Sequence, residues 1–227
     1  MALPAYAARA INRTDLRCIL PALHSWYDFS DTATLTLDGS GNIQTINDKS
    51  GNARHATQAT STLRPSVGAI NGLTAAQYVT VNSDMELRAT VASSLPVEVC
   101  AVAVSDIAAG INYETIVSSL AANNGGLQTI GATNWVWQYP TSFTGWATNG
   151  VRALAAYPTI QSPFVQQIWN WAGDGWSYTQ IGQDRTGMQR NWKGRVGELA
   201  LFNRALTTQE RDFVKYSMAR KWGIAVV

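Results

Sequence analysis

The sequence is poor in charge and has very little cysteine or histidine. Lysine and arginine number 17, aspartate and glutamate 15, and charged residues make up only 14% of the 227 positions. More than two adjacent cations never occur, so we do not expect nucleic acid as a partner. Two cysteines cannot form a disulfide framework. We expect Cys100 to be a buried apolar side chain, whereas Cys18 is a candidate for an intersubunit disulfide.

Long apolar runs are also absent. A stretch of about 18 apolar residues would be needed for a membrane-spanning helix, and the sequence contains none. Residues 1–22 carry Arg9, Arg13, Asp15 and Arg17, which interrupt any apolar core of a secretory signal. We therefore expect a protein made in a reducing cytoplasm, without a signal peptide or membrane span.

The residue patterns of common enzymes are missing as well. His24 and His55 are the only histidines, and neither belongs to a pair with metal-ligand spacing. Glycosidases that cleave polysaccharides need two neighbouring carboxyl groups, which a strand presents at alternating positions. The glutamates of the expected strands, Glu98, Glu114 and Glu198, have no carboxylate two residues away. We therefore expect the protein not to be an enzyme.

What the sequence does contain is a series of short strand-like segments separated by turn residues. They lie at residues 23–27, 34–37, 43–46, 75–81, 97–104, 114–119, 127–130, 134–138, 151–157, 164–171, 176–181 and 195–202. The Gly-rich segment at residues 38–42 is typical of a hairpin turn. Many short strands without helical periodicity between them predict an all-β fold, a two-sheet antiparallel jelly-roll sandwich.

The one exception to this pattern is at the C-terminus, where the spacing predicts a helix over about residues 208–222. Thr207 and Glu210 have the spacing of a capping box, and Gly223 is a typical helix stop. The expected buried stripe consists of Phe213, Val214, Met218 and Trp222. In the strand before this helix, Glu198, Ala200 and Phe202 should share one face.

The N-terminal end has a different composition from the rest of the chain. We interpret residues 1–22 as an arm, helical around residues 5–20 and ended by Pro21, and residues 23–227 as a single domain. The arm is a candidate anchor to other proteins or a contact within a homo-oligomer.

The middle of the sequence is uncharged but rich in tryptophan. Between Thr115 and Gly173 the only charged residue is Arg152, and seven of the nine tryptophans lie between positions 135 and 192. Flat indole rings beside amide side chains favour stacking with sugars. The candidate carbohydrate-binding residues are Trp146, Trp176, Trp135, Trp137, Tyr139 and Asp174. We place Trp146 and Trp176 in exposed loops, whereas Trp135 and Trp137 could equally fill the core. The uncharged surface is equally suited to a subunit interface.

Four segments together carry a resemblance to a known superfamily. They are LHSWYDFSD at residues 23–31, NDKSGNARHATQ at 47–58, INGL at 70–73 and GRVGELALFNRAL at 194–206. The sequence resembles the laminin-G-like jelly rolls of the concanavalin A-like lectin/glucanase superfamily, in versions found in bacteriophage virion proteins and bacterial surface proteins. The resemblance covers residues 23–75 and 192–223.

Some relatives with this fold hold calcium in loops at the sheet edge. Here Asp48 and Asn52 are the corresponding candidates. Calcium prefers six to eight oxygen ligands, and this segment offers one carboxylate next to Lys49. We therefore favour a turn in which Asp48 accepts hydrogen bonds from nearby backbone amides. We expect no cofactor, with calcium as the one candidate.

The resemblance also implies a setting and a role. It suggests a non-enzymatic virion protein of a tailed phage, made in the host cytoplasm and displayed on the tail or capsid surface. Such a protein would contact other virion proteins through residues 1–22 and bind host-surface glycans through its tryptophan-rich part. A purely structural decoration or docking protein is the alternative, and a polysaccharide-degrading enzyme is the third candidate.

Overall fold

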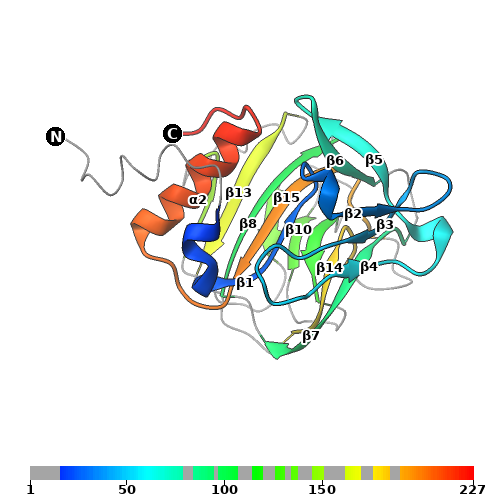
Figure 1. The fold of residues 1–227 in the computed structure, drawn as a ribbon. Coiled ribbons are helices and arrows are strands. Elements are labelled where there is room, and N and C mark those ends of the chain that lie inside the picture. The colour runs from blue at the N-terminus through cyan, green and yellow to red at the C-terminus, as the bar shows by residue number, and fades with distance from the viewer. Residues whose placement is uncertain are drawn as a thin grey trace.

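The structure is a computed structural model that describes residues 16–78, 84–94, 97–106, 114–119, 126–130, 134–137, 145–150, 162–169, 176–184 and 190–227. In these ranges, strands form two antiparallel sheets, and a single α-helix follows the last strand (Figure 1). The predicted two-sheet β-sandwich with a C-terminal helix is thus confirmed.

The first sheet, called sheet A, has seven strands in the order β12-β13-β8-β15-β6-β5, with β1 paired to β15. Its strands are β1 (Leu23–Asp28), β5 (Ser66–Ile70), β6 (Leu73–Tyr78), β8 (Glu98–Ser105), β12 (Gly145–Thr148), β13 (Phe164–Trp169) and β15 (Gly194–Phe202). Strand β15 is the longest and pairs with β1, β6 and β8, so it forms the centre of this sheet.

The second sheet, called sheet B, has eight strands in the order β11-β10-β9-β14-β7-β4-β3-β2. Its strands are β2 (Leu35–Leu37), β3 (Ile43–Ile46), β4 (Ala56–Thr57), β7 (Leu87–Ser94), β9 (Thr115–Ser118), β10 (Gly126–Ile130), β11 (Asn134–Trp137) and β14 (Trp176–Ile181). The hairpin expected at residues 38–42 connects β2 to β3. Asp38 stabilises it by accepting hydrogen bonds from the amides of Ser40 and Asn42.

Strand β8 of sheet A is buried on both faces, as the alternation of its residues between two apolar clusters shows. Val99, Ala101 and Ala103 belong to the core between the sheets. The residues between them, Cys100 and Val102, belong to a second apolar cluster under the C-terminal helix. A strand covered on both sides gains from apolar residues at every position, which explains the nearly continuous apolar sequence of this segment.

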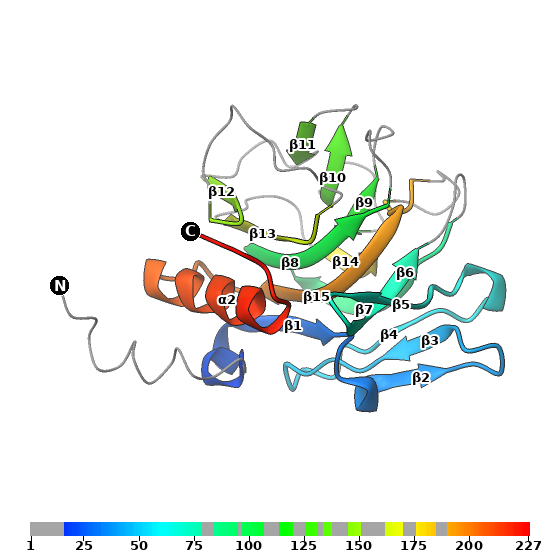
Figure 2. The same cartoon turned by 90° about the horizontal axis from the view of Figure 1, so that it is seen from above.

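Helix α2 (Thr208–Lys221) lies against the outer face of sheet A, on the side away from sheet B (Figure 2). The predicted capping box is confirmed, with Thr207 as N-cap and Glu210 at the third helical position. Val214, Met218 and Trp222 are buried and Phe213 is partly buried, as predicted. These side chains pack on Ala200 and Phe202 of β15, which share a face as expected.

The N-terminal arm differs from the expectation in one respect. Residues 16–22 form η1 (Leu16–Ala22), a 3-10 helix that contains Pro21 and continues to Ala22, so Pro21 does not end it. The reason is a break at Ile19, whose backbone is not helical, so Pro21 enters near the start of a new turn where its missing N–H costs little. The expected helix around residues 5–15 lies outside the described residues. The remaining short helices are η2 (Thr32–Thr34) and η3 (Ser61–Leu63).

Cys100 is buried as predicted, and Cys18 is exposed. Among the helices of the described ranges, none combines the length and apolar character that a membrane crossing requires.

Candidate polar face of sheet B and the buried ion cluster

The predicted tryptophan sites fall in parts of the chain that the structure describes only by backbone or not at all. Trp146 lies in β12 and pairs with Ile168, so it is in an edge strand and not in the loop expected from sequence. Trp176 begins β14, and Trp135 and Trp137 lie in β11. The side chains of all four lie outside the described residues, as do Tyr139 and Asp174 entirely.

The segment considered for calcium is a hydrogen-bonded turn. One oxygen of Asp48 accepts from the amides of Trp26 and Ser50, both at 2.9 Å. The other accepts from the Ser50 hydroxyl at 2.7 Å and from the Arg54 amide at 3.0 Å. Asn52 donates its side-chain amide to the carbonyl of Leu23 at 2.9 Å. Both carboxylate oxygens of Asp48 are thus engaged by N–H and O–H donors, as in the turn interpretation.

The histidines belong to the same region. His55 accepts the Asp48 amide on Nδ1 at 3.0 Å, which ties the end of the turn to its beginning. His24 is 1% exposed, and burial lowers its pKa to about 4, with the Arg54 charge acting in the same direction. Both histidines therefore have structural roles.

A row of polar side chains crosses the outer face of sheet B. Cross-strand pairing places Thr36, Thr45, Thr57, Arg88, Gln180 and Ser118 opposite one another on six successive strands. Their sequence neighbours Ile46, Ala56 and Ile181 belong to the core between the sheets. Because side chains alternate along a strand, the row is directed away from that core. We call this row, together with Thr90, Tyr178, Asp84 and Glu86, the polar face.

The two ends of the polar face differ in the solvent exposure of their side chains. Gln180 and Ser118 are buried, Arg88, Tyr178 and Thr45 are half-buried, and Thr36, Thr57 and Thr90 are exposed. The open end therefore lies over β2, β3, β4 and β7. Sheet A differs in this respect, because α2 packs on the outer face of its strands β8, β13 and β15.

Glu86, which immediately precedes β7, organises the polar face. Its Oε1 accepts hydrogen bonds from Arg88 Nη2 at 2.6 Å and Gln58 Nε2 at 3.4 Å, and its Oε2 accepts from Gln180 Nε2. The side chain is 5% exposed, and burial raises its pKa although the Arg88 charge works against this. One buried carboxylate thus fixes the orientation of three donor side chains.

Aromatic surface is present on the same face. The Arg88 guanidinium carbon lies 5.5 Å from the centroid of the Tyr178 ring, in a cation–π arrangement. Tyr178 pairs across the strands with Thr90. A half-buried ring therefore stands beside a fixed guanidinium and a threonine hydroxyl.

The sequence interpretation overlooked a carboxylate pair at this site. Asp84 and Glu86 stand two residues apart, with the core residue Met85 between them. Asp84 Oδ1 accepts a hydrogen bond from Gln183 Nε2 at 2.6 Å, and the Asp84 charge contributes to the raised pKa of Glu86. The alternation Asp-x-Glu-x-Arg over residues 84–88 was the available signal. It was missed because the expected strand was placed before it, at residues 75–81.

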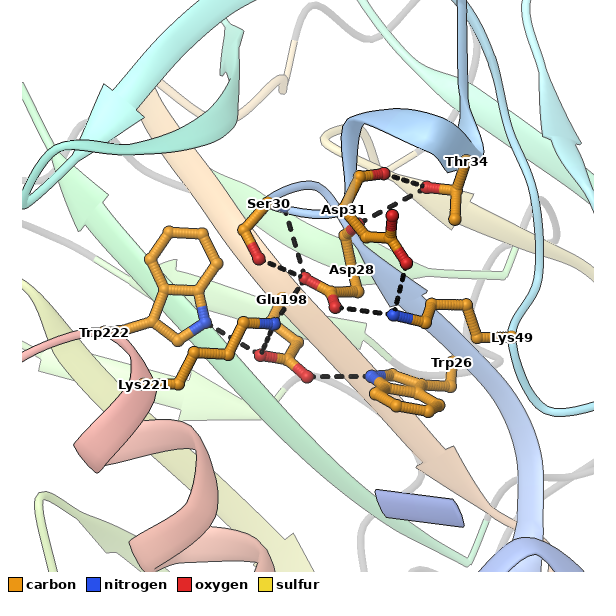
Figure 3. A network of polar contacts seen from close by, with 9 residues as sticks. All are labelled: Trp26, Asp28, Ser30, Asp31, Thr34, Lys49, Glu198, Lys221 and Trp222. Atoms are coloured by element: carbon orange, nitrogen blue, oxygen red, sulfur yellow. Dashed lines mark hydrogen bonds and ion pairs between the residues drawn. The ribbon is translucent and has the colours of Figure 1, made fainter. Parts of the chain in front are cut away.

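A second pair of carboxylates lies on the other side of sheet A, beneath α2 (Figure 3). Asp28 of β1 and Glu198 of β15 are cross-strand partners, and both contact the ammonium group of Lys221. Their side chains are 5% and 1% exposed. This cluster is therefore closed to a polymeric substrate, and no glycosidase cleft is formed there. Sequence could not reveal it, because Asp28 lies 193 positions before Lys221.

Comparisons with known proteins add no assignment: no protein-family model matches the sequence, and no curated protein does.

Proposed function

We propose that this protein is a non-enzymatic carbohydrate-binding protein that holds neutral glycan chains on the polar face of sheet B. The observation that carries the proposal is the organisation of Arg88, Gln180 and Gln58 around buried Glu86, next to Tyr178.

The composition of the face supports sugar recognition. The guanidinium of Arg88 and the exposed threonine hydroxyls can exchange hydrogen bonds with sugar hydroxyls, and the Tyr178 ring offers a surface for the apolar C–H groups of a pyranose. Side chains already held in place lose little conformational entropy when a ligand binds. Glu86 offsets the charge of Arg88, which favours a neutral glycan over an acidic one.

A second candidate activity, polysaccharide cleavage, is favoured by the Asp84–Glu86 alternation and by the raised pKa of Glu86. A general acid needs such a pKa, but it also needs a carboxyl group that can reach the glycosidic oxygen. Both oxygens of Glu86 already accept hydrogen bonds from neighbouring side chains. This arrangement favours a positioning role for Glu86, and hence binding without cleavage.

The experiment is a titration of neutral and acidic polysaccharides against the wild type and Tyr178→Ala. We expect Tyr178→Ala to weaken binding about tenfold, in the range of a lost stacking contact. Tyr216→Ala is the matched control, because Tyr216 is 47% exposed but lies on α2, on the far side of sheet A. Equal losses in the two variants, or no binding by the wild type, would overturn the proposal.

Two further variants separate the remaining candidates. If Trp146→Ala or Trp176→Ala abolishes binding while Tyr178→Ala does not, the glycan site lies in the tryptophan-rich segments instead. Release of reducing ends that is lost in Glu86→Gln would identify an enzyme.

The resemblance of residues 23–75 and 192–223 to virion jelly rolls supports a biological setting for the proposal. In that setting the protein is displayed on a phage tail or capsid, as a tail-fibre or decoration component, and residues 1–22 anchor it to other virion proteins. Many copies of the protein on one particle would convert weak binding sites into firm adhesion.

Two experiments test this setting. Light scattering shows whether the protein forms a homo-oligomer, and deletion of residues 1–22 should abolish its incorporation into particles. Incorporation without glycan binding would support the purely structural alternative.

A further inference from the structure

A cluster of three carboxylates and two lysines lies between β1, β15 and α2, on the opposite side of sheet A from the polar face (Figure 3). Lys221, the last residue of α2, places Nζ 2.5 Å from Asp28 Oδ1 and 3.0 Å from Glu198 Oε2. Lys49 places its own Nζ 2.9 Å from Asp28 Oδ2 and 2.7 Å from Asp31 Oδ2. Asp28 is thus held between two ammonium groups.

Two tryptophans enclose the cluster. Trp26 Nε1 and Trp222 Nε1 each donate a hydrogen bond to Glu198 at 2.8 Å, one to each carboxylate oxygen. The two indoles are 2% and 0% exposed. Lys49 lies 4.6 Å from the Trp26 ring centroid, and Lys221 lies 5.5 Å from that of Trp222. A primary amine and two carboxyl groups are therefore in contact in a site from which most water is excluded.

The charges of the cluster do not balance. Asp28, Asp31 and Glu198 supply one more negative charge than Lys49 and Lys221 can neutralise. Burial raises the pKa of Glu198 in spite of the Lys221 charge. Burial acts in the same direction on Asp28, but the charge and hydrogen bonds of the lysines outweigh it and lower the pKa of Asp28. Of the two carboxylates that contact Lys221, Glu198 therefore takes up a proton more readily than Asp28.

We propose that Lys221 and Asp28 condense into an intramolecular isopeptide bond, with Glu198 as the proton carrier. In the first step the Lys221 ammonium gives one proton to Glu198 and becomes a neutral amine. The amine nitrogen then forms a bond to Cγ of Asp28. Nitrogen loses a second proton, Glu198 returns the first, and both leave with Oδ1 as one water molecule. The nitrogen keeps one hydrogen, Oδ2 becomes the amide oxygen, and no oxidant or other reactant is needed.

The surroundings favour this step in three ways. Lys49 remains beside Oδ2, where negative charge develops during attack, and Ser30 donates to Oδ1 at 2.7 Å through its hydroxyl. The reacting groups are already in contact, which removes most of the entropic cost of bringing them together. Condensation also replaces a buried ion pair with a neutral amide, and this relieves the desolvation cost of two charges.

Lys221 is the reacting amine for geometric reasons. It is closer to Asp28 than Lys49 is, and its side chain is 16% exposed against 24%. Lys221 also contacts Glu198, the proton acceptor, whereas the carboxylates bound by Lys49 are Asp28 and Asp31. The product would join two residues 193 positions apart and covalently fasten α2 to the first strand.

The test is the intact mass of the purified, denatured full-length protein, followed by fragmentation of its proteolytic peptides. The wild type should be lighter than its sequence mass by one water molecule. Fragmentation should find the peptide containing Asp28 linked to the one containing Lys221. A wild type of full sequence mass, also after long incubation, would overturn the proposal, and so would a linkage to Lys49.

Three variants make the result specific. Lys221→Arg keeps the positive charge but has no primary amine, so it should have the full sequence mass. Glu198→Gln keeps the size of the side chain and one accepting oxygen but cannot carry the proton, and it too should have the full mass while circular dichroism shows the native fold. Lys215→Arg, on the same helix and bound to the Val227 carbonyl, should still lose the water. Loss of water in Lys221→Arg would assign the missing mass to a different reaction, such as succinimide formation at the Asp38-Gly39 step, and would overturn the proposal.

Discussion

The Arg211 guanidinium contacts both carboxylate oxygens of Glu98, with Nε 3.0 Å from Oε2 and Nη2 2.5 Å from Oε1. Glu98 Oε1 also accepts the Leu206 amide at 2.9 Å, and Arg211 lies 5.1 Å from the centroid of the Trp169 ring. This single pair therefore connects β8, the turn before α2, and α2 itself.

Removal of the cation from this pair should be costly. Arg211→Met leaves the Glu98 carboxylate, which is 3% exposed, without its counter-ion, and we expect the free energy of unfolding to fall by about 3 kcal/mol. Urea unfolding followed by tryptophan fluorescence measures the change. Arg204→Met is the control, because Arg204 pairs with Glu210 but its side chain is 47% exposed, and its loss should cost under about 1 kcal/mol. Equal losses in both variants would contradict this role.

Gly197 should not tolerate a methyl group. A Cβ built there would lie 2.7–2.9 Å from three ring atoms of Trp222, which has little room to move because it is fully buried. We expect Gly197→Ala to lower the free energy of unfolding by about 1–3 kcal/mol through overpacking. At Gly39 nothing lies within 4 Å of the added carbon, so Gly39→Ala should change stability by less than about 0.5 kcal/mol. A neutral Gly197→Ala would show that α2 lies farther from sheet A.

His24 should make the fold sensitive to mild acid. Burial lowers its pKa from 6.5 to about 4, so the unfolded chain binds more protons than the folded one between these values. Stability contributed by neutral His24 is then fully present above pH 6.5 and is lost as the pH falls toward 4, by on the order of 3 kcal/mol at most. Urea unfolding of wild type and His24→Gln across this range is the measurement. The variant should show a flatter pH dependence, and parallel curves would contradict the prediction.

The Asp48 turn can be distinguished from a calcium site by thermal unfolding. Asp48→Ala removes the acceptor of four hydrogen bonds, and we expect a loss of about 3 kcal/mol with or without calcium. Added calcium should leave the Tm of the wild type unchanged. A rise in Tm with calcium that disappears in Asp48→Ala would instead support the metal site.

Local patterns were sufficient for part of this description. The cap at Thr207, the buried stripe that includes Met218 and Trp222, and the continuous apolar run of β8 depend on residues a few positions apart. For such elements hydrogen bonding and periodicity act within one segment, so the predicted helix agrees with α2 to within a residue at its C-terminal end. The strand containing Leu87 was not predicted, although its outer residues include Arg88 of the polar face.

The amino-acid sequence by itself determined the β-rich fold class, the two-sheet arrangement, the C-terminal helix and the low charge of the chain, because these follow from composition and short-range periodicity. Only the tertiary structure decided that Thr57, Arg88 and Gln180 form one row, and that Asp28, Glu198 and Lys221 meet under α2. The physical reason is that strand register and helix docking depend on how the whole core packs. Residues far apart in the chain become neighbours only once that core has formed.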